Sequence, residues 1–369
     1  MNGRSSATGA GGSSRPWNFA RRVFPGLGRS RGRSASRSEG GSALIVALWV
    51  ILILSLLIGS FAFDMRVEAA ITSHYRKRVK ADYLARAGVE WAKLLFDRRQ
   101  DADPSLPDDQ VDDVMLNAEH LSRGMGITGF RQELGDGTFT VDILPEEGRR
   151  NVNKLTREEW EEILDEGGVP VERWDELIDC FTDWTDANDE HEVNGAEADD
   201  AFYVQRGYAP KNGPVDSIDE MLLIKGFDEK ILYGGMPDTK ERDAQPMLGI
   251  AKWLTTWGNG KVNANTASRE VLMSIPGITD DEVDSIIDGR VGDDGTLGTR
   301  DDGYATLDEL FSVVALPADL RKSLSVKDLT YVRVVSVGEV HGVRSGVWAV
   351  FQVSQNKVIP VFWREEAMP

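Results

Sequence analysis

The sequence predicts an α+β protein in which a long N-terminal helix packs on an antiparallel sheet and a large helical unit is inserted into that sheet. Three observations lead to this prediction. Residues 42–95 favour one helix, alternating apolar residues favour strands near 138–144 and within 331–363, and helical signals fill residues 146–328. With 369 residues, the chain is long enough for two or three folded units.

The N-terminal helix is predicted to cross a membrane. Ser42–Phe63 is a run of 22 residues without a formal charge, and as a helix it spans about 33 Å, enough for a hydrocarbon layer of about 30 Å. Residues 64–87 contain neither Pro nor Gly. Apolar residues then recur at helical spacing: Val79, Tyr83, Ala87 and Trp91. We therefore expect one helix over Ala43–Leu95, apolar all round at first and amphipathic later.

Charge is distributed unevenly along the chain. Residues 1–41 form a leader with eight arginines and one acid, whereas the whole chain has 42 basic and 61 acidic residues and a net charge of −19. A basic flank before the span predicts a cytoplasmic N-terminus and an outer body. The acidic body disfavours nucleic acid, and the lone Cys180 excludes an intrachain disulfide and a cysteine-cluster metal site.

Two other readings of the apolar run remain open. A signal peptide is the main alternative, because Ser60-Phe61-Ala62 would suit a small-x-small cleavage site. A buried core helix fits less well, since the run is long and uniformly apolar. The absence of a helix break after the run favours a permanent anchor.

The predicted body divides into segments. After the leader (1–41) and the span (42–63), residues 64–145 hold the rest of the helix, a loop and the first strand; residues 146–328 form the inserted helical domain, and residues 329–369 close the sheet. Strands are expected at 138–144, 331–340, 343–353 and 357–363, with a turn at His341-Gly342. Capping boxes are expected at Thr156/Glu159, Ser217/Glu220, Thr279/Glu282 and Thr306/Glu309.

The inserted domain contains a predicted internal repeat. Asn153–Glu158 parallels Asn265–Glu270, and Ser217–Met221 parallels Thr306–Leu310. Each half then holds a helix start, an acidic loop and a closing helix.

The N-terminus resembles that of type IV pilin-like proteins: Gly41 is followed by Ser42-Ala43-Leu44-Ile45-Val46. In that family a prepilin peptidase cuts after the glycine and the new N-terminal amine is methylated, which implies cleavage between Gly41 and Ser42 and N-methylation of Ser42. Most such subunits carry glutamate at the fifth mature position, where this chain has Val46. A carboxylate there would neutralise a neighbour's buried amine, so its absence suits the first subunit of a filament.

Further motifs resemble the general secretion pathway protein K family, the large minor pseudopilins of type II secretion. They are Ala85–Trp91, Asp183–Glu190, Gly195–Glu197, Tyr203, Lys211–Pro214, Ser217–Leu222 and Val262–Ala267. The resemblance implies a pilin-like fold with an inserted domain of the SAM or helix-hairpin-helix kind. It also implies a single-pass protein of the bacterial inner membrane, with its bulk in the periplasm. The expected place is the pseudopilus tip, which supports export of folded proteins across the outer membrane. Expected partners are the I- and J-type minor pseudopilins, the inner-membrane assembly platform and the prepilin peptidase.

An acidic loop predicts a calcium site, which the resemblance also implies. Residues 183–200 contain eight acids and no Lys or Arg, and Ca²⁺ takes six to eight flexible oxygen ligands. The expected ligands are Asp183, Asp186, Asp189, Glu190, Glu197 and Asp200. His191 stands where an EF-hand has its glycine, and a solvated acidic loop is the alternative.

A weaker second calcium site is expected in the corresponding loop of the other half. Its candidate ligands are Asp293, Asp294, Asp301 and Asp302, interspersed with glycines. A turn that needs no metal is the alternative there.

One motif gives an alternative function. Ile275–Thr279 resembles a helix-hairpin-helix turn, which would make the chain a membrane-anchored DNA-binding protein. Four acids crowd the place where a phosphate would dock: Asp280, Asp281, Glu282 and Asp284. No catalytic residues are identified, because the sequence offers no convincing Ser/His/Asp group, HExxH motif or phosphate loop. The chain is therefore expected not to be an enzyme.

Overall fold

The computed structural model describes residues 40–99, 106–237, 245–327, 329–354 and 357–368. Most of the predicted leader, residues 1–39, and residues 100–105 of the loop after the helix lie outside this part of the chain. The chain divides into two compact units, residues 1–67 and 68–369.

Helix α1 is the principal element of the first unit and continues into the second. It runs over Gly40–Arg98 without interruption, so the predicted continuous helix is confirmed. Within the first unit its side chains from Ser42 to Val67 are exposed, including the large apolar ones. It is the one helix in the described residues that is long and apolar enough to cross a membrane. Apolar residues all round and without protein cover are typical of a membrane anchor.

The second unit contains a five-stranded antiparallel sheet in the order β1-β2-β7-β8-β9. The strands are β1 (Ile127–Leu134), β2 (Gly137–Pro145), β7 (Tyr331–Val340), β8 (Val343–Ser354) and β9 (Lys357–Met368). All four predicted strands are present, and His341 and Gly342 form the turn between β7 and β8, both with positive φ. Strand β1 was not predicted, because as an edge strand it is mostly exposed and its register is irregular between Ile127 and Phe130.

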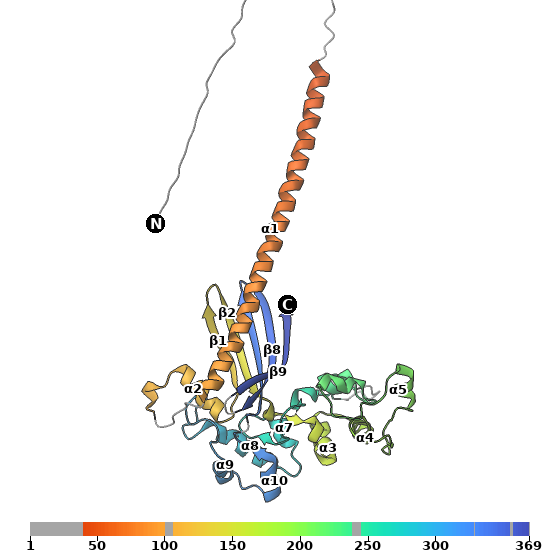
Figure 1. The fold of residues 1–369 in the computed structure, drawn as a ribbon, viewed down its shortest axis with the longest axis vertical. Coiled ribbons are helices and arrows are strands. Elements are labelled where there is room, and N and C mark those ends of the chain that lie inside the picture. The colour runs from red at the N-terminus through yellow and green to blue at the C-terminus, as the bar shows by residue number, and fades with distance from the viewer. Residues whose placement is uncertain (1–39, 100–105, 238–244, 328, 355–356, 369) are drawn as a thin grey trace, which may run out of the picture. The chain divides into compact units, whose positions relative to one another are not determined.

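The later part of α1 packs on one face of this sheet (Figure 1). Its buried side chains include Ala81, Ala85, Val89 and Ala92, which contact a layer of branched residues such as Val141 and Val334. Two glycines bring the backbones close together. A Cβ on Gly88 of α1 would lie 2.2 Å from the Ser336 Oγ, and one on Gly338 of β7 would lie 2.0 Å from the Ala81 carbonyl oxygen.

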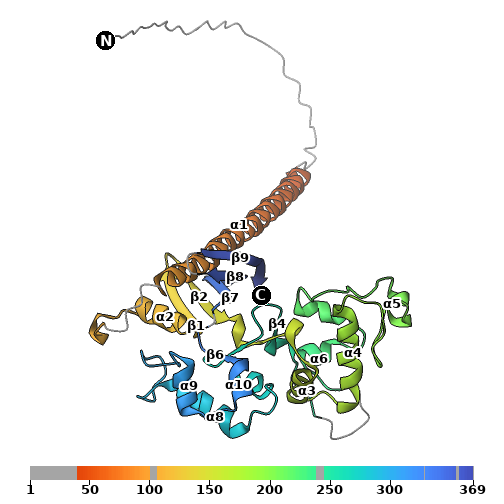
Figure 2. The ribbon, with the colours of Figure 1, turned by 60° about the horizontal axis from the view of Figure 1, so that its bottom comes forward.

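The inserted unit leaves the sheet after β2 and returns to it before β7. Because Pro145 is the register partner of Val332, its two ends are neighbours (Figure 2). Its first half contains η3 (Glu146–Gly148), β3 (Arg150–Asn151), η4 (Val152–Lys154), α3 (Arg157–Glu166), η5 (Val171–Arg173), α4 (Trp174–Thr185), α5 (Ala201–Arg206), η6 (Ile218–Leu223), α6 (Glu229–Tyr233), η7 (Ala251–Trp253) and β4 (Leu254–Thr255). Its second half contains β5 (Val262–Asn263), α7 (Arg269–Met273), α8 (Asp280–Asp288), η8 (Gly289–Val291), α9 (Leu307–Val313), α10 (Ala318–Ser323) and β6 (Leu324–Ser325). Outside the inserted unit, η2 (Asp108–Gln110) and α2 (Asp113–Ser122) lie between α1 and β1.

The hydrogen bonds of the inserted unit confirm its internal repeat. Each half is closed by a short parallel strand pair, β3 with β4 and β5 with β6. Asn153 bridges to the backbone of Val215, accepting from its N–H at 2.7 Å and donating to its carbonyl at 3.0 Å. Asn265 makes the same two bonds to Tyr304, at 2.8 and 3.0 Å. The two asparagines therefore hold equivalent loops.

Two of the four predicted capping boxes are complete, those of Thr156 and Thr279. The box at Ser217 is wrong, since its side chain makes no cap hydrogen bond and Glu220 accepts from the N–H of Asp216 instead. At the equivalent place in the second half, Thr306 accepts from Glu309 N, while the Glu309 carboxylate accepts from Ala305 N. In both halves the glutamate thus reaches one residue further back than expected.

Substitution of Gly338 by Ala should lower the free energy of unfolding by about 1–3 kcal/mol, because the new methyl group would overlap backbone atoms of α1. The matched control is Gly213→Ala, where only one atom lies within 4 Å, at 3.9 Å. That change should stay within about 0.5 kcal/mol. Denaturant unfolding of the full chain in detergent measures both. Equal stabilities of the two variants would contradict the close helix–sheet approach.

Candidate functional site

The predicted processing site lies in the first turn of α1. The helix begins at Gly40, so Gly41 and Ser42 are both helical, and Val46 is exposed one turn later. Cleavage after Gly41 and methylation of Ser42 remain predictions.

The acidic loop of the first half begins in the last turn of α4. Asp183 is fully buried there, and Glu197 is only 2% exposed. One oxygen of Asp183, Oδ1, accepts from the Glu192 N–H at 2.9 Å. The other Asp183 oxygen and both carboxylate oxygens of Glu197 have no hydrogen-bond partner. Buried polar atoms without partners are rare in native proteins and point to a missing ion or water.

The pKa values of Asp183 and Glu197 also indicate that their negative charges lack compensation. Burial raises the pKa of Asp183 above its usual range, and the negative charge of Asp186 adds to the shift. Burial also raises the pKa of Glu197, with further contributions from Asp183, Asp186 and Asp189. The backbone comes close to them, since a Cβ on Gly195 would lie 2.0 Å from Asp183 Oδ2. These carboxylates therefore fit a hard cation such as Ca²⁺, which would supply the positive charge they lack.

The remaining predicted ligands of this loop are placed differently. Asp186 accepts from Asn188 N, Asp189 accepts from the Asn212 side chain at 2.9 Å, and Glu190 is exposed. Asp200 caps α5 and forms an ion pair with Lys225 at 2.9 Å, whose hydrogen bond lowers the pKa of Asp200. In the described residues no three His, Cys, Asp or Glu side chains are gathered closely enough to hold a metal ion. Of the predicted ligands, Asp183 and Glu197 therefore remain the best candidates, because they have buried oxygens without partners. Asp200 instead caps α5 and pairs with Lys225.

The second acidic loop is closed by its own hydrogen bonds. Asp301 Oδ2 accepts from the N–H groups of Asp293 and Asp294, and its Oδ1 accepts from the Thr299 hydroxyl. These bonds, with that of Thr299 the largest cause, lower the pKa of Asp301. Asp302 is buried, but its Oδ2 accepts from Gly298 N at 2.6 Å. These carboxylates have protein donors, so the loop fits a metal less well than the first.

Aromatic residues of the protein K motifs support the first loop. Trp184 stacks at a tilt on Tyr203, with ring centroids 6.0 Å apart, and donates to Glu220 at 3.0 Å. Lys211 forms ion pairs with both Asp216 and Glu220. The bridging role of Asn153 and Asn265 was not predicted, although their place in the repeated motif was a usable signal.

The segment that resembles a helix-hairpin-helix has that local geometry. Helices α7 and α8 flank a turn in which Gly277 has a φ of +82°. Its apolar residues Ile275 and Ile278 join the core of the inserted unit. The side chain of Arg269 pairs with Asp280 and Asp284 of α8, so this cation is already neutralised within the motif.

A long N-terminal helix packed across an antiparallel sheet, with a helical insertion between β2 and β7, defines a type IV pilin-like fold. Residues 137–234, from β2 to the end of α6, match the family model for Type II secretion system (T2SS), protein K. The resemblance drawn from the sequence motifs is thereby confirmed.

A solved structure has a similar fold. A chain of the GspK-GspI-GspJ complex from the type 2 secretion system of enterotoxigenic Escherichia coli superposes with a TM-score of 0.51 at 12% sequence identity. The match covers 82% of this chain and 100% of that chain. No curated protein matches the sequence. Together, the family match and the shared fold support a minor pseudopilin of the protein K type and give no support to the DNA-binding alternative.

Replacement of Glu197 by Gln should stabilise the protein in the presence of a calcium chelator. Because the folded-state pKa of Glu197 is raised, its charge costs stability above that pKa. The variant should gain about 1–3 kcal/mol at pH 7, and the gain should vanish as the pH falls towards the ordinary glutamate pKa of about 4.3. Thermal unfolding across this pH range measures the difference.

The matched control is Glu192→Gln, which removes an exposed acid of the same loop and should show no such gain. If E197Q were less stable than the unchanged protein in chelator, the charge of Glu197 would not be the uncompensated cost that we infer.

Proposed function

We propose that this chain acts at the tip of a type II secretion pseudopilus as a minor pseudopilin and supports export of folded proteins across the outer membrane. One observation carries the proposal: the pilin-like sheet and helix hold a protein K insertion between β2 and β7. The anchor is α1, the one helix of the described residues that is long and apolar enough to cross a membrane.

The basic leader and acidic body support an orientation across the inner membrane. The eight arginines of residues 1–41 favour the cytoplasm, and the body then lies in the periplasm. In this arrangement the prepilin peptidase cuts between Gly41 and Ser42. The processed subunit then joins the assembly platform in the membrane.

Two features favour the tip over a position inside the filament. Val46 offers no carboxylate to the N-terminal amine of a neighbouring subunit in the membrane. The inserted unit adds residues 146–330 to one end of the sheet, and its bulk would obstruct a subunit stacked beyond it. The I- and J-type minor pseudopilins are the proposed partners, in line with the solved complex of similar fold. The function is structural, with no catalytic residues proposed.

Calcium is proposed to stabilise the first acidic loop. Asp183 and Glu197 would hold the ion, with the half-buried Asp186 and the exposed Asp189 and Glu190 completing its oxygen shell after local adjustment. The support comes from their unpartnered buried oxygens. Asp200 is bound to Lys225 and the second loop satisfies its own carboxylates, so both are weaker candidates.

The tip position predicts where the subunit appears on pseudopili. Antibody-gold labelling should mark one end only. A variant in which a short Gly-Ser linker replaces residues 146–330 and Val46 is changed to Glu should also label the filament sides, since both obstacles to stacking are removed. V46E alone, which keeps the inserted unit, should still label one end. Side labelling by the unchanged protein would refute the tip assignment.

Processing predicts a defined new N-terminus. Mass spectrometry of the protein extracted from membranes should give a first residue Ser42 carrying a methyl group. A Gly41→Leu variant should keep the leader, and Gly40→Leu serves as the matched control. A first residue near Phe63 would indicate a cleaved signal peptide and a soluble product instead.

Calcium should raise the melting temperature of the full chain in detergent. At a concentration one hundred times the dissociation constant the added stability is about 2.7 kcal/mol. Asp183→Asn should abolish most of this rise, whereas Asp301→Asn, in the self-satisfied loop, should retain it. An unchanged melting temperature at millimolar calcium would remove calcium from the proposal.

A further inference from the structure

A cavity of about 580 Å³ lies where the inserted unit meets the sheet face opposite α1. On the sheet side, Arg333, Trp348, Phe362 and Arg364 project from β7, β8 and β9. On the other side lie Arg149 after η3, residues 216–219, and residues 251–252 and 254–257 around η7 and β4. The register confirms the face, because Trp348 is paired with Val335 and Arg364 while the flanking Val347 and Ala349 contact the α1 side.

Basic side chains predominate in the lining of this cavity. Four cations, Arg149, Lys252, Arg333 and Arg364, accompany two acids, Asp216 and Asp219. Both acids are already engaged: Asp216 pairs with Lys211 at 2.7 Å, and Asp219 accepts a hydrogen bond from the Tyr233 hydroxyl. Basic side chains therefore outnumber acidic ones in this lining, although the charge of the whole chain is −19.

Arg149 differs from the other three cations. Arg333 pairs with Glu146 at 2.7 Å, Arg364 lies 3.6 Å from Glu366, and Lys252 donates to the Leu248 carbonyl. Arg149 is half-buried, and within the described part of the chain its guanidinium forms no hydrogen bond or ion pair. Burial, together with the nearby charge of Arg333, lowers the pKa of Arg149 to about 10, although Glu146 opposes the shift. An unpaired and partly desolvated cation is costly unless an anion reaches it.

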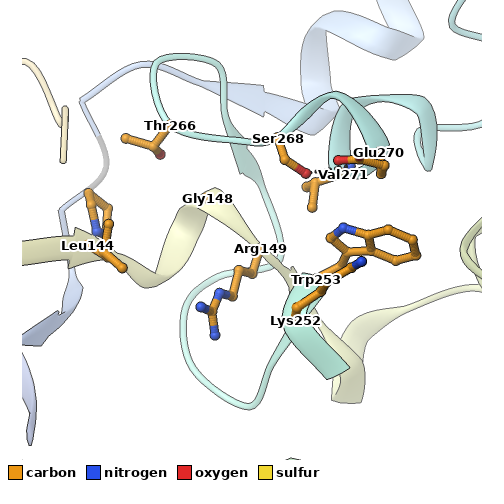
Figure 3. A pocket seen from close by; sticks show the side chains of 10 residues that line it. Leu144, Gly148, Arg149, Lys252, Trp253, Thr266, Ser268, Glu270 and Val271 are labelled. Carbon is orange, nitrogen blue, oxygen red and sulfur yellow. Dashed lines mark hydrogen bonds between the residues drawn. The ribbon is translucent and has the colours of Figure 1, made fainter. Parts of the chain in front are cut away.

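A second, smaller cavity of about 400 Å³ shares Arg149 and Lys252 with the first. Figure 3 shows both cations on one side of it and Thr266 and Ser268 on the other. The Thr266 hydroxyl is buried without a partner. Arg149 thus lines both cavities, and a ligand in the larger cavity could contact it.

The walls of the larger cavity define what could accompany an anion. Trp348 and Phe362 meet edge to face at 4.5 Å, and Trp257 packs on Tyr331 at 5.3 Å. Ile218 and Leu254 add aliphatic surface. Such walls favour an aromatic or apolar group, and the planar guanidinium favours a carboxylate that can accept two parallel hydrogen bonds.

We propose that this cavity is a binding site for a carboxylate that carries an aromatic or apolar group, with Arg149 as its charged anchor. The ligand is either a glutamate or aspartate beside an apolar residue in a polypeptide, or a free aromatic acid of the same chemistry. The inference goes beyond the proposed function and does not depend on it.

Calorimetry on the full chain in a neutral detergent tests the proposal with two matched probe pairs. The first pair is 3-phenylpropanoate and 3-phenylpropanamide; the second is N-acetyl-Phe-Glu-amide and N-acetyl-Phe-Gln-amide. In each pair that binds, the acid should bind about tenfold more tightly than the amide, the effect of one charge-assisted contact. The preference should weaken at high salt. A tighter dipeptide acid identifies a polypeptide ligand, and a tighter phenylpropanoate identifies a small molecule.

Arg149→Gln should abolish the preference for the acid, whereas Arg131→Gln, an exposed arginine on β1 outside the cavity, should preserve it. Arg364→Gln should reduce the preference without abolishing it. Because Arg149 has no partner to lose, R149Q should keep or raise the melting temperature, which a purely structural arginine would not do. Equal binding of acid and amide, or equal losses in R149Q and R131Q, would overturn the proposal.

Discussion

The close approach of α1 to the sheet is the constraint on which the rest of the second unit depends. Gly88 and Gly338 allow the helix backbone to rest against β7, and small residues such as Ala81 and Ala85 continue the contact. Such close packing has one favourable register, because bulkier residues on either surface would force the two elements apart. Once β7 is fixed in this way, β2 and β8 pair with it on either side, and the ends of the inserted unit are placed beside each other.

The inserted unit consists of two structural repeats, or copies, of unequal length. In each copy an asparagine after a short strand bridges to a distant loop, and a parallel strand pair closes the copy. The copies differ in their acidic loops. The first leaves Asp183 Oδ2 and both carboxylate oxygens of Glu197 without donors, whereas the second supplies Asp301 with backbone N–H groups. A shared scaffold therefore supports one loop with buried carboxylate oxygens that lack donors and one loop in which the carboxylates of Asp301 and Asp302 have protein donors.

Much of this fold could be predicted from the sequence because its signals are local. An uninterrupted apolar and then amphipathic run specified α1, and alternation specified β7, β8 and β9. Strand β1 has an exposed, irregular pattern and gave no such signal. In the acidic loop the abundance of charge was evident from the sequence, but the different surroundings of its acids were not. Asp183 is buried, whereas Asp200 is neutralised by Lys225, which lies 25 residues away in the sequence. The unpaired Arg149 is likewise a result of tertiary packing, which composition and spacing do not encode.

The placement of the two connections also determines how the sheet responds to mechanical load. Both leave from the same end of the antiparallel β2–β7 pair, at Pro145 and Val332. A pull on the inserted unit therefore draws both strands in one direction, and the ladder between them experiences little relative sliding. The shear falls on the outer ladders, β1–β2 and the long β7–β8 pairing, and on the helix packed across them. The hydrogen bonds of the β1–β2 and β7–β8 ladders share this load, so many of them must break at once before the inserted unit can be pulled away from the sheet.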